Sequence, residues 1–191
     1  MNKGTSDIQL LGISGSLRRA SFATAILHGA GDILGARASM TCFDIGQIPL
    51  YNQDMDGDNK PESVVALKQA IESSDGVIVS SPEYNYGISG VLKNAIDWAS
   101  RPGFNSVLKG KPVLYMTSSP GAVGGARAQV HLLELFSATM SRVVVGPHIT
   151  VAAAQTKIKD GRLVDAATIE FIGGGIDSLL REIAAVRAAQ S

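Results

Sequence analysis

The sequence predicts an α/β fold in which five parallel strands form one sheet with helices on both faces. Short apolar segments alternate with longer segments of helical periodicity from one end of the chain to the other. Repeated strand–helix units of this length are typical of a parallel sheet that is covered on both faces. The 191 residues are enough for one substantial core, so we expect a single domain over residues 1–191.

The expected strands are short apolar segments that lie between the helices. They cover residues 8–14, 40–43, 77–80 and 112–117, followed by a fifth strand formed by residues 142–145 and 149–152. The fifth strand is expected to break at Gly146-Pro147. The single Cys42 lies in the second strand, where we expect a buried and unreactive thiol.

The expected helices carry apolar residues at helical spacing, as at Phe22, Ile26, Ala30 and Leu34. They cover residues 22–36, 61–74, 91–100, 126–139 and 166–189. Residues 46–60 form a long loop before the second helix, and long loops in compact domains are often functional.

The composition argues against several function classes. The chain holds 17 Lys and Arg residues and 17 Asp and Glu residues, with no block of basic residues, so we expect no nucleic-acid partner. No apolar run reaches the length of a membrane span, and the first residues lack the apolar core of a signal peptide. We therefore expect a soluble, cytoplasmic protein without a membrane partner.

The segment after the third strand is the most informative part of the chain. Residues 80–102 read SSPEYNYGISGVLKNAIDWASRP, a proline loop with two tyrosines that leads into a helix. This order places a flat, hydrogen-bonding surface at the carboxyl edge of the sheet, where ligands bind in open α/β sheets. A planar heterocycle such as a flavin would suit this surface.

The loop between the first strand and the first helix favours a phosphate. Residues 12–21 read GISGSLRRAS, in which Gly15 permits a tight turn while three serines and two arginines offer donors. The helix that follows adds free N–H groups and a partial positive charge. The loop matches neither GxxxxGK[ST] nor GxGxxG, and its serines favour a monophosphate such as that of FMN over a pyrophosphate. A plain strand–turn–helix junction is the alternative.

The loop after the fourth strand supports the same site. Residues 117–127 read TSSPGAVGGAR, and the glycines allow the backbone to approach a ring closely. Alone, this loop could equally be a flexible connection. Because the loops after the first, third and fourth strands share one edge of the sheet, together they predict a ligand site.

Three segments of the chain resemble the NAD(P)H-dependent FMN reductase family, in its quinone- and chromate-reductase branch. They read GSLRRASF, PEYNYGISGVLKNAIDWASRP and GKPVLYMTSSPGAVGGARAQ, and the resemblance extends over roughly residues 8–150. It implies a flavodoxin-like fold that binds FMN without a covalent bond and takes hydride from NADH or NADPH. It also implies a homodimer or homotetramer.

The resemblance implies which residues hold the cofactor. Those around the phosphate are Ser16, Arg18, Ser21, Phe22 and Ala23. Those along the isoalloxazine are Pro82, Glu83, Tyr84, Asn85 and Tyr86, with Ser118 and Ser119 at its border. The family usually carries Asn where this chain has Ala23, so one side-chain contact to the phosphate is missing. Residues 49–54, which read PLYNQD, resemble the family segment near the substrate side.

The implied activity is ping-pong transfer of two electrons from NADH or NADPH through FMN to a quinone, with chromate, azo or nitro compounds as further acceptors. The sequence shows no nucleophile, acid–base or metal motif, so we expect no catalytic side chain and no metal. One alternative is a reductase that releases reduced FMN. Another is a flavodoxin-type electron carrier, although such carriers dock through a strongly acidic face, which the balanced charge argues against.

Overall fold

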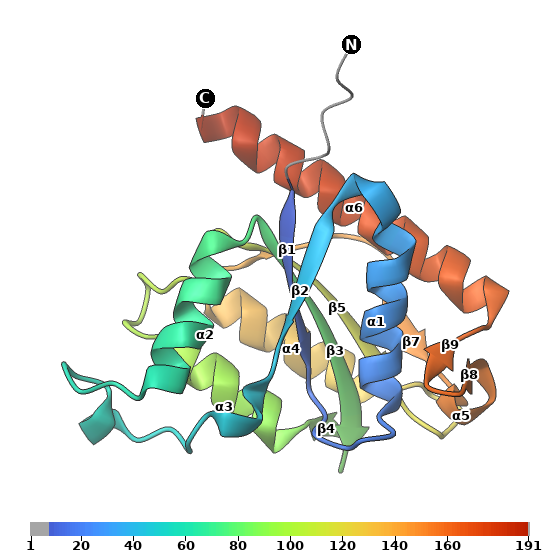
Figure 1. Cartoon of the computed structure of the whole chain (residues 1–191), viewed down its shortest axis with the longest axis horizontal. Helices are drawn as coiled ribbons and strands as arrows, with labels where there is room; N and C mark the ends of the chain where they lie inside the picture. The colour runs from blue at the N-terminus through green and yellow to red at the C-terminus, as the bar shows by residue number, and fades with distance from the viewer. Residues whose placement is uncertain (1–7, 191) are drawn as a thin grey trace.

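The computed structural model describes residues 8–190, which form a central sheet flanked by helices on both sides (Figure 1). Strand β1 (Gln9–Ser14) pairs in parallel with β2 (Ser39–Phe43) and with β3 (Gly76–Tyr84), and β3 pairs in parallel with β5 (Pro112–Ser118). The order β2-β1-β3-β5-β6 is that of a flavodoxin-like doubly wound sheet. The predicted α/β class is therefore confirmed.

The sheet has seven strands, so the predicted number of five is wrong. Strand β4 (Gly87–Ile88) folds back antiparallel on β3. The fifth predicted strand is two separate strands, β6 (Arg142–Val143) and β7 (Ile149–Val151), each parallel to β5. The interruption includes Gly146-Pro147, where proline cannot donate a hydrogen bond to a neighbouring strand.

Helices of the two faces enclose separate cores. On one face lie α1 (Phe22–Leu34) and α6 (Ala166–Gln190), and on the other lie α2 (Glu62–Ser73), α3 (Gly90–Ala99) and α4 (Ala126–Ala138). These bounds agree with the predicted helices to within two residues. A small hairpin of β8 (Ile158–Lys159) and β9 (Arg162–Leu163), which the sequence did not indicate, follows the short α5 (Ala154–Lys157) and packs on α1.

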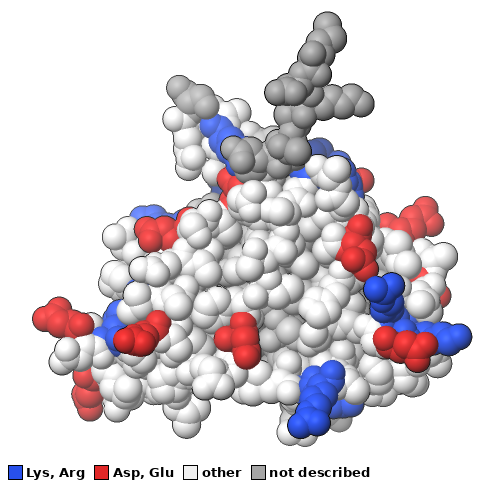
Figure 2. All heavy atoms as spheres, viewed as in Figure 1, with Lys and Arg blue, Asp and Glu red and all other residues white. Residues whose placement is uncertain are grey.

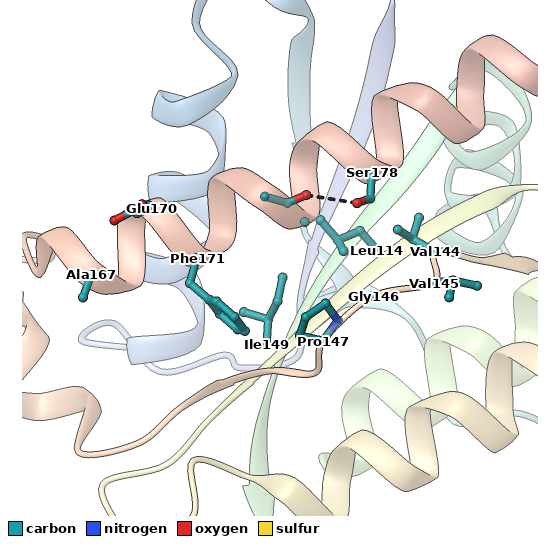
Figure 3. A pocket seen from close by; sticks show the side chains of 12 residues that line it. Leu114, Val144, Val145, Gly146, Pro147, Ile149, Ala167, Glu170, Phe171 and Ser178 are labelled. Atoms are coloured by element: carbon teal, nitrogen blue, oxygen red, sulfur yellow. Dashed lines mark hydrogen bonds between the residues drawn. The ribbon is translucent and has the colours of Figure 1, made fainter.

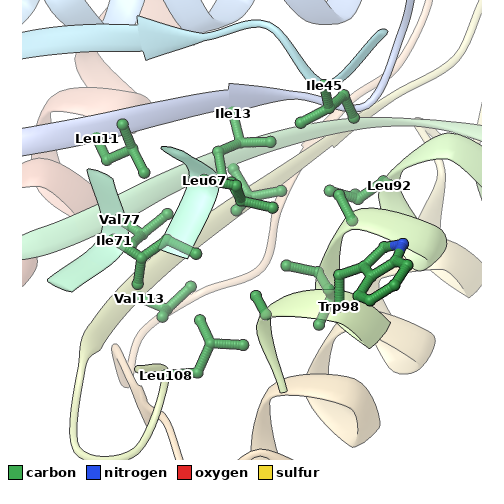
Figure 4. Close-up of a cluster of buried hydrophobic side chains, with 14 of the residues drawn as sticks. Leu11, Ile13, Ile45, Leu67, Ile71, Val77, Leu92, Trp98, Leu108 and Val113 are labelled. Carbon is green, nitrogen blue, oxygen red and sulfur yellow. The ribbon is translucent and has the colours of Figure 1, made fainter. Parts of the chain in front are cut away.

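Successive side chains of the central strands point to opposite faces of the sheet, so each strand contributes apolar residues to both cores. Val77 and Val79 of β3 point to the α2–α3–α4 side, while Ile78 between them points to the α1–α6 side. Figure 4 shows Val77 beside Ile71 of α2, with Trp98 of α3 in the same cluster. A strand buried on both faces reads as a continuous apolar run, which is why the sequence predicted it.

Cys42 is exposed, so its predicted burial is wrong. The reason is that β2 is an edge strand of the sheet. Partial burial still raises the pKa of the Cys42 thiol, which favours the unreactive protonated form at neutral pH. Among the described helices, none is long and apolar enough to cross a membrane.

Three consecutive glycines in α6 have different surroundings. A Cβ on Gly175 would lie 2.5 Å from Cδ1 of Ile149, a buried residue of β7 in the sheet. A Cβ on Gly174 would meet no atom within 4 Å. Gly175 therefore allows α6 to approach the sheet, whereas Gly174 only lowers the helix propensity of α6.

We predict opposite effects of alanine at these two glycines. Gly174→Ala should raise the free energy of unfolding by about 0.5–1 kcal/mol, because alanine favours the helix. Gly175→Ala should lower it by about 1–3 kcal/mol, because the buried Ile149 must move. Urea unfolding of the two variants measures both changes, and equal shifts would contradict the packing role of Gly175.

Candidate functional site

The chain order of the sheet reverses beside β1, which pairs with β2 on one side and β3 on the other. In doubly wound sheets, the carboxyl ends of the strands at such a reversal bind ligands. A cavity of about 590 Å³ lies there, and it includes Gly15, Ser16 and Arg18 after β1 and Tyr84 at the end of β3. A volume of this size is typical of small-molecule sites.

A second cavity, of about 460 Å³, lies between α6 and the break in the fifth strand (Figure 3). Phe171 of α6 and Ile149 of β7 are among its lining residues. None of the residues that line it belongs to the three predicted loops. The cavity at the chain reversal is therefore the one that matches the predicted site.

The first loop is held firmly against β3. The N–H of Gly15 donates to the carbonyl of Ser80 at 2.8 Å. A Cβ on Gly15 would lie 3.0 Å from Oγ of Ser89 and 3.2 Å from Oγ of Ser81. Both serines belong to the segment around the third loop, so the first and third loops are in direct contact because residue 15 has no side chain.

Donors gather where the first loop enters α1. Oγ of Ser21 caps the helix by accepting the N–H of Thr24 at 3.1 Å. The N–H groups of Phe22 and Ala23 belong to the first turn, where no intrahelical partner exists. The guanidinium of Arg18 donates to the carbonyl of Ala20 at 3.2 Å, which keeps it beside the helix start.

This end of the site has the chemistry that binds an anion. The first turn of α1 contains no acidic residue, and its N-terminus carries a partial positive charge. Ser16 and Arg18 line the cavity, whereas Ser21, Phe22 and Ala23 are not among the residues that line it. The side chain of Ala23 is buried in the core, so only its backbone can contribute. Together these groups suit a phosphate.

The third loop is a strained hairpin that sequence reasoning missed. β3 continues through Pro82 to Tyr84. Its pairing with β1 ends at Ser80, so on the β1 side Pro82 faces no strand that would need a hydrogen bond from its nitrogen. Asn85 and Tyr86 then form the turn to β4, with φ of 48° and 68°. Positive φ is unusual for a bulky residue and costs about 1–3 kcal/mol, a strain that is common at functional sites.

Arg127 stabilises this hairpin from the fourth loop. Its guanidinium lies 4.0 Å from the centre of the Tyr86 ring, a cation–π contact. Tyr86 is 66% exposed and Tyr84 is 48% exposed, and Tyr84 lines the cavity. The hairpin therefore presents its tyrosines and its backbone at the carboxyl edge of the sheet.

Glu83 joins the third loop to the fourth. Its Oε2 accepts the N–H groups of Arg127 at 2.9 Å and Ala128 at 3.0 Å. The residue before α4, Gly125, provides no side-chain cap, so Glu83 caps this helix from another part of the chain. Its carboxylate is thus engaged in positioning the loops.

The fourth loop depends on two glycines with positive φ, Gly124 at 64° and Gly125 at 88°. A Cβ on Gly124 would lie 2.7 Å from the backbone nitrogen of Ala152. Ser118 is buried at the end of β5, and Oγ of Ser119 accepts the N–H of Gly121 at 3.0 Å. Neither serine is among the residues that line the cavity, although Ser118 pairs in register with Pro82.

One wall of the cavity contains none of the residues that were expected to bind the cofactor. This wall is mainly apolar. It is formed by the 46–60 loop, by the residue just before that loop and by the first half of α3, where Asn94 is its polar member. Its residues are Ile45, Ile48, Leu50, Val91 and Asn94. The sequence indicated this loop by its length and by the resemblance of residues 49–54 to the family segment near the substrate side, but no local pattern brings the loop to α3.

The family model of NADPH-dependent FMN reductases matches residues 8–156. The chain belongs to this family. It is 38% identical over 176 residues to an NAD(P)H-dependent FMN reductase of Pseudomonas aeruginosa, covering 92% of this chain and 95% of that one. It is 46% identical over 161 residues to a 2-hydroxy-1,4-benzoquinone reductase of a Burkholderia species, covering 84% and 87% of the two chains.

A solved structure agrees with this assignment. The flavoenzyme NAD(P)H:(acceptor) oxidoreductase from Paracoccus denitrificans superposes with a TM-score of 0.83 at 34% identity, covering 93% of this chain and 97% of that one. The flavodoxin-like fold and the family of oxidoreductases implied by the sequence motifs are therefore confirmed.

We predict that Glu83 contributes to stability through its cap on α4. Glu83→Ala should lower the free energy of unfolding by about 1.5–3 kcal/mol, because two N–H groups lose a charged acceptor. Glu83→Gln should cost less, because an amide oxygen can still accept. The control is Glu134→Ala, which removes an exposed carboxylate from the same helix. Equal urea midpoints for Glu83→Ala and the control would contradict the capping role.

Proposed function

We propose that this chain is an FMN-dependent NAD(P)H oxidoreductase, which passes two electrons to quinones and to similar acceptors such as chromate, azo or nitro compounds. The observation that carries the proposal is the contact of the first and third loops at Gly15, which joins an anion-binding end and a ring-binding end in one cavity. Family membership and the names of the relatives support it.

The donor set fits the phosphate of FMN. In this proposal Ser16, Arg18, Ser21 and the N–H groups of Phe22 and Ala23 bind the phosphate. The ring lies along Pro82, Tyr84, Asn85 and Tyr86, with the backbone of Glu83 and with Ser118 and Ser119 at its border. Gly15 supports the fit, since a side chain there would press against Ser81 and Ser89 of the third loop.

The residues of the cavity hold and orient, while the cofactor supplies the chemistry. Of the described residues that line it, only Arg18 is charged, so the cavity offers no acid–base pair. When bound, FMN supplies hydride transfer, so that NADPH, one proton and a quinone give NADP⁺ and a hydroquinone. We propose that donor and acceptor use this cavity in turn, in a ping-pong sequence, with NADH or NADPH as donor.

A flavodoxin-type carrier is less well supported. Figure 2 shows charged side chains of both signs interspersed on one face, and the acidic and basic residues of the chain are equal in number. A carrier needs a surface of one sign to attract its partners. A reductase that releases reduced FMN would use the same site. The two functions differ in one observation, which is whether the flavin stays bound to the protein during turnover.

We also propose a homodimer or homotetramer in the cytoplasm. Exposed apolar side chains lie on α4, at Val130 and Leu133, and in the loop before it, at Val123. The start of α4 contacts the hairpin through Arg127 and Tyr86. Light scattering during gel filtration should give a mass of two or four chains.

We predict that the purified protein shows flavin absorption bands. Denatured protein should release FMN, NADPH should bleach the bands without oxygen, and a benzoquinone should restore them. Initial rates at several fixed quinone concentrations should give parallel double-reciprocal lines. Release of FAD, or failure to load any flavin, would contradict the proposed cofactor, and intersecting lines would contradict the shared site.

We predict that Arg18→Ala weakens FMN binding by about 1.5–3 kcal/mol, the range for hydrogen bonds to charged groups. Arg19→Ala is the matched control, because Arg19 is also exposed but is not among the residues that line the cavity. Titration of flavin-free protein with FMN measures both affinities. An equal loss in the two variants would mean that charge alone, without a specific role of Arg18, attracts the phosphate.

A further inference from the structure

Residues 49–51 of the long loop are bonded to α3 on both sides of Leu50. The carbonyl of Pro49 accepts Nδ2 of Asn94 at 2.9 Å and Nε1 of Trp98 at 2.8 Å. Oδ1 of Asn94 accepts the N–H of Tyr51 at 2.8 Å. One amide side chain thus satisfies the peptide groups before and after Leu50, which fixes the backbone at this position.

The neighbours of Leu50 are held inward. Ile48 is buried in the core on the α3 side of the sheet. The ring of Tyr51 meets Trp98 edge-on, with 4.9 Å between ring centres, and the guanidinium of Arg101 lies 5.3 Å from the same ring. Leu50, in contrast, is 83% exposed. A rigid backbone therefore presents one apolar side chain outward.

The side chain of Leu50 lines the cavity at the chain reversal. Leu17, which is 54% exposed, and Tyr84 line the same cavity, so three exposed apolar groups lie around this site. Covering such groups with a flat apolar molecule removes their surface from water, which favours binding. An isolated exposed leucine needs no explanation, but three such groups around one cavity indicate a contact surface for a ligand.

We propose that Leu50 selects the electron acceptor by packing against the apolar part of a quinone, and that Asn94 and Trp98 are positioning residues that hold Leu50 in place. This inference rests on the function proposed above and identifies Leu50 as the residue that determines the preference for an acceptor. It concerns acceptors that extend beyond one ring, because a second ring adds apolar surface for Leu50 to cover. Contact with part of a leucine side chain changes an affinity by about five- to tenfold.

The first test compares Leu50→Ala with the unchanged protein on two acceptors. The quantity is kcat/KM for 1,4-naphthoquinone divided by kcat/KM for 1,4-benzoquinone, with NADPH as donor. In a ping-pong sequence each kcat/KM contains only steps that follow entry of the acceptor, so the ratio is independent of the donor. We expect Leu50→Ala to lower the ratio about five- to tenfold.

The control for this test is Val145→Ala, which truncates a 91% exposed apolar residue at the other cavity. It should leave the ratio unchanged. An unchanged ratio in Leu50→Ala, or an equal fall in both variants, would overturn the role of Leu50. A protein that binds no FMN or reduces neither quinone would contradict the proposed function, which is a separate result.

The second test asks whether Asn94 acts through Leu50. Asn94→Ala should lower the ratio about as much as Leu50→Ala, and the double variant should show no further fall, because the two changes remove the same contact. A further fall of equal size in the double variant would mean that Asn94 acts independently of Leu50. If Asn94→Ala does not fold, Trp98→Phe removes one of the bonds to Pro49 and goes through the same cycle.

A third measurement does not depend on activity. Trp98 is the single tryptophan of the chain and is buried beneath residues 49–51, so its fluorescence in flavin-free protein reports the position of that segment. Asn94→Ala should shift its emission to longer wavelength and increase quenching by acrylamide, while Leu50→Ala should not. Unchanged emission in Asn94→Ala would overturn the positioning role.

Discussion

Contact between the first and third loops at Gly15 is the constraint on which the site depends. The N–H of Gly15 is bonded to Ser80, and any side chain at this position would press against Ser81 and Ser89. Ser89 in turn caps α3, from which Asn94 and Trp98 hold the long loop. The anion-binding end, the hairpin and the apolar wall are therefore connected through one position where a larger residue would be crowded by two serines.

The scaffold fixes the site with polar groups that lie outside the proposed chemistry. Glu83 caps α4, Oγ1 of Thr117 donates to the carbonyl of Gly124 at 3.0 Å, and Asn94 bonds two peptide groups of the long loop. The bonds of Glu83 and Asn94 join segments that are distant in sequence, while the bond of Thr117 fixes the fourth loop internally. A site that binds a cofactor with its own reactivity needs rigid positioning more than it needs reactive side chains, and these contacts provide it.

Sequence reasoning succeeded where the signal was local and failed where it was tertiary. Apolar periodicity predicted the helices, and the serine-rich turn after the first strand predicted an anion site before any contact was known. It failed at Cys42, because the position of β2 at the sheet edge is not written in β2 itself. It also ended the third strand too early, since only the register of β1 shows why β3 can continue through Pro82.

At the site, too, sequence reasoning missed the features that depend on tertiary contacts. The turn at Asn85-Tyr86 lacks the glycine that normally marks positive φ, so the hairpin was not foreseen. The wall around Leu50 depends on bonds between residues more than forty positions apart, from Asn94 and Trp98 to the loop. Patterns within one segment cannot reveal such contacts, although the length of the loop and its resemblance to the family segment near the substrate side showed where to look for them.

The chemistry of the cavity explains why acceptor choice would be broad yet still adjustable. Its anion-binding end is directional, because charge-assisted hydrogen bonds from Arg18 and the start of α1 depend on geometry. Its apolar side chains, which include Leu17, Leu50 and Tyr84, impose no direction on a ligand, because the gain from burying them depends mainly on area. Apolar pockets discriminate between related ligands by only about 10- to 200-fold, so the wall favours flat molecules of suitable size without requiring one pattern of hydrogen bonds. In the proposed function, polar groups specify cofactor binding, while apolar side chains from several segments set the range of acceptors.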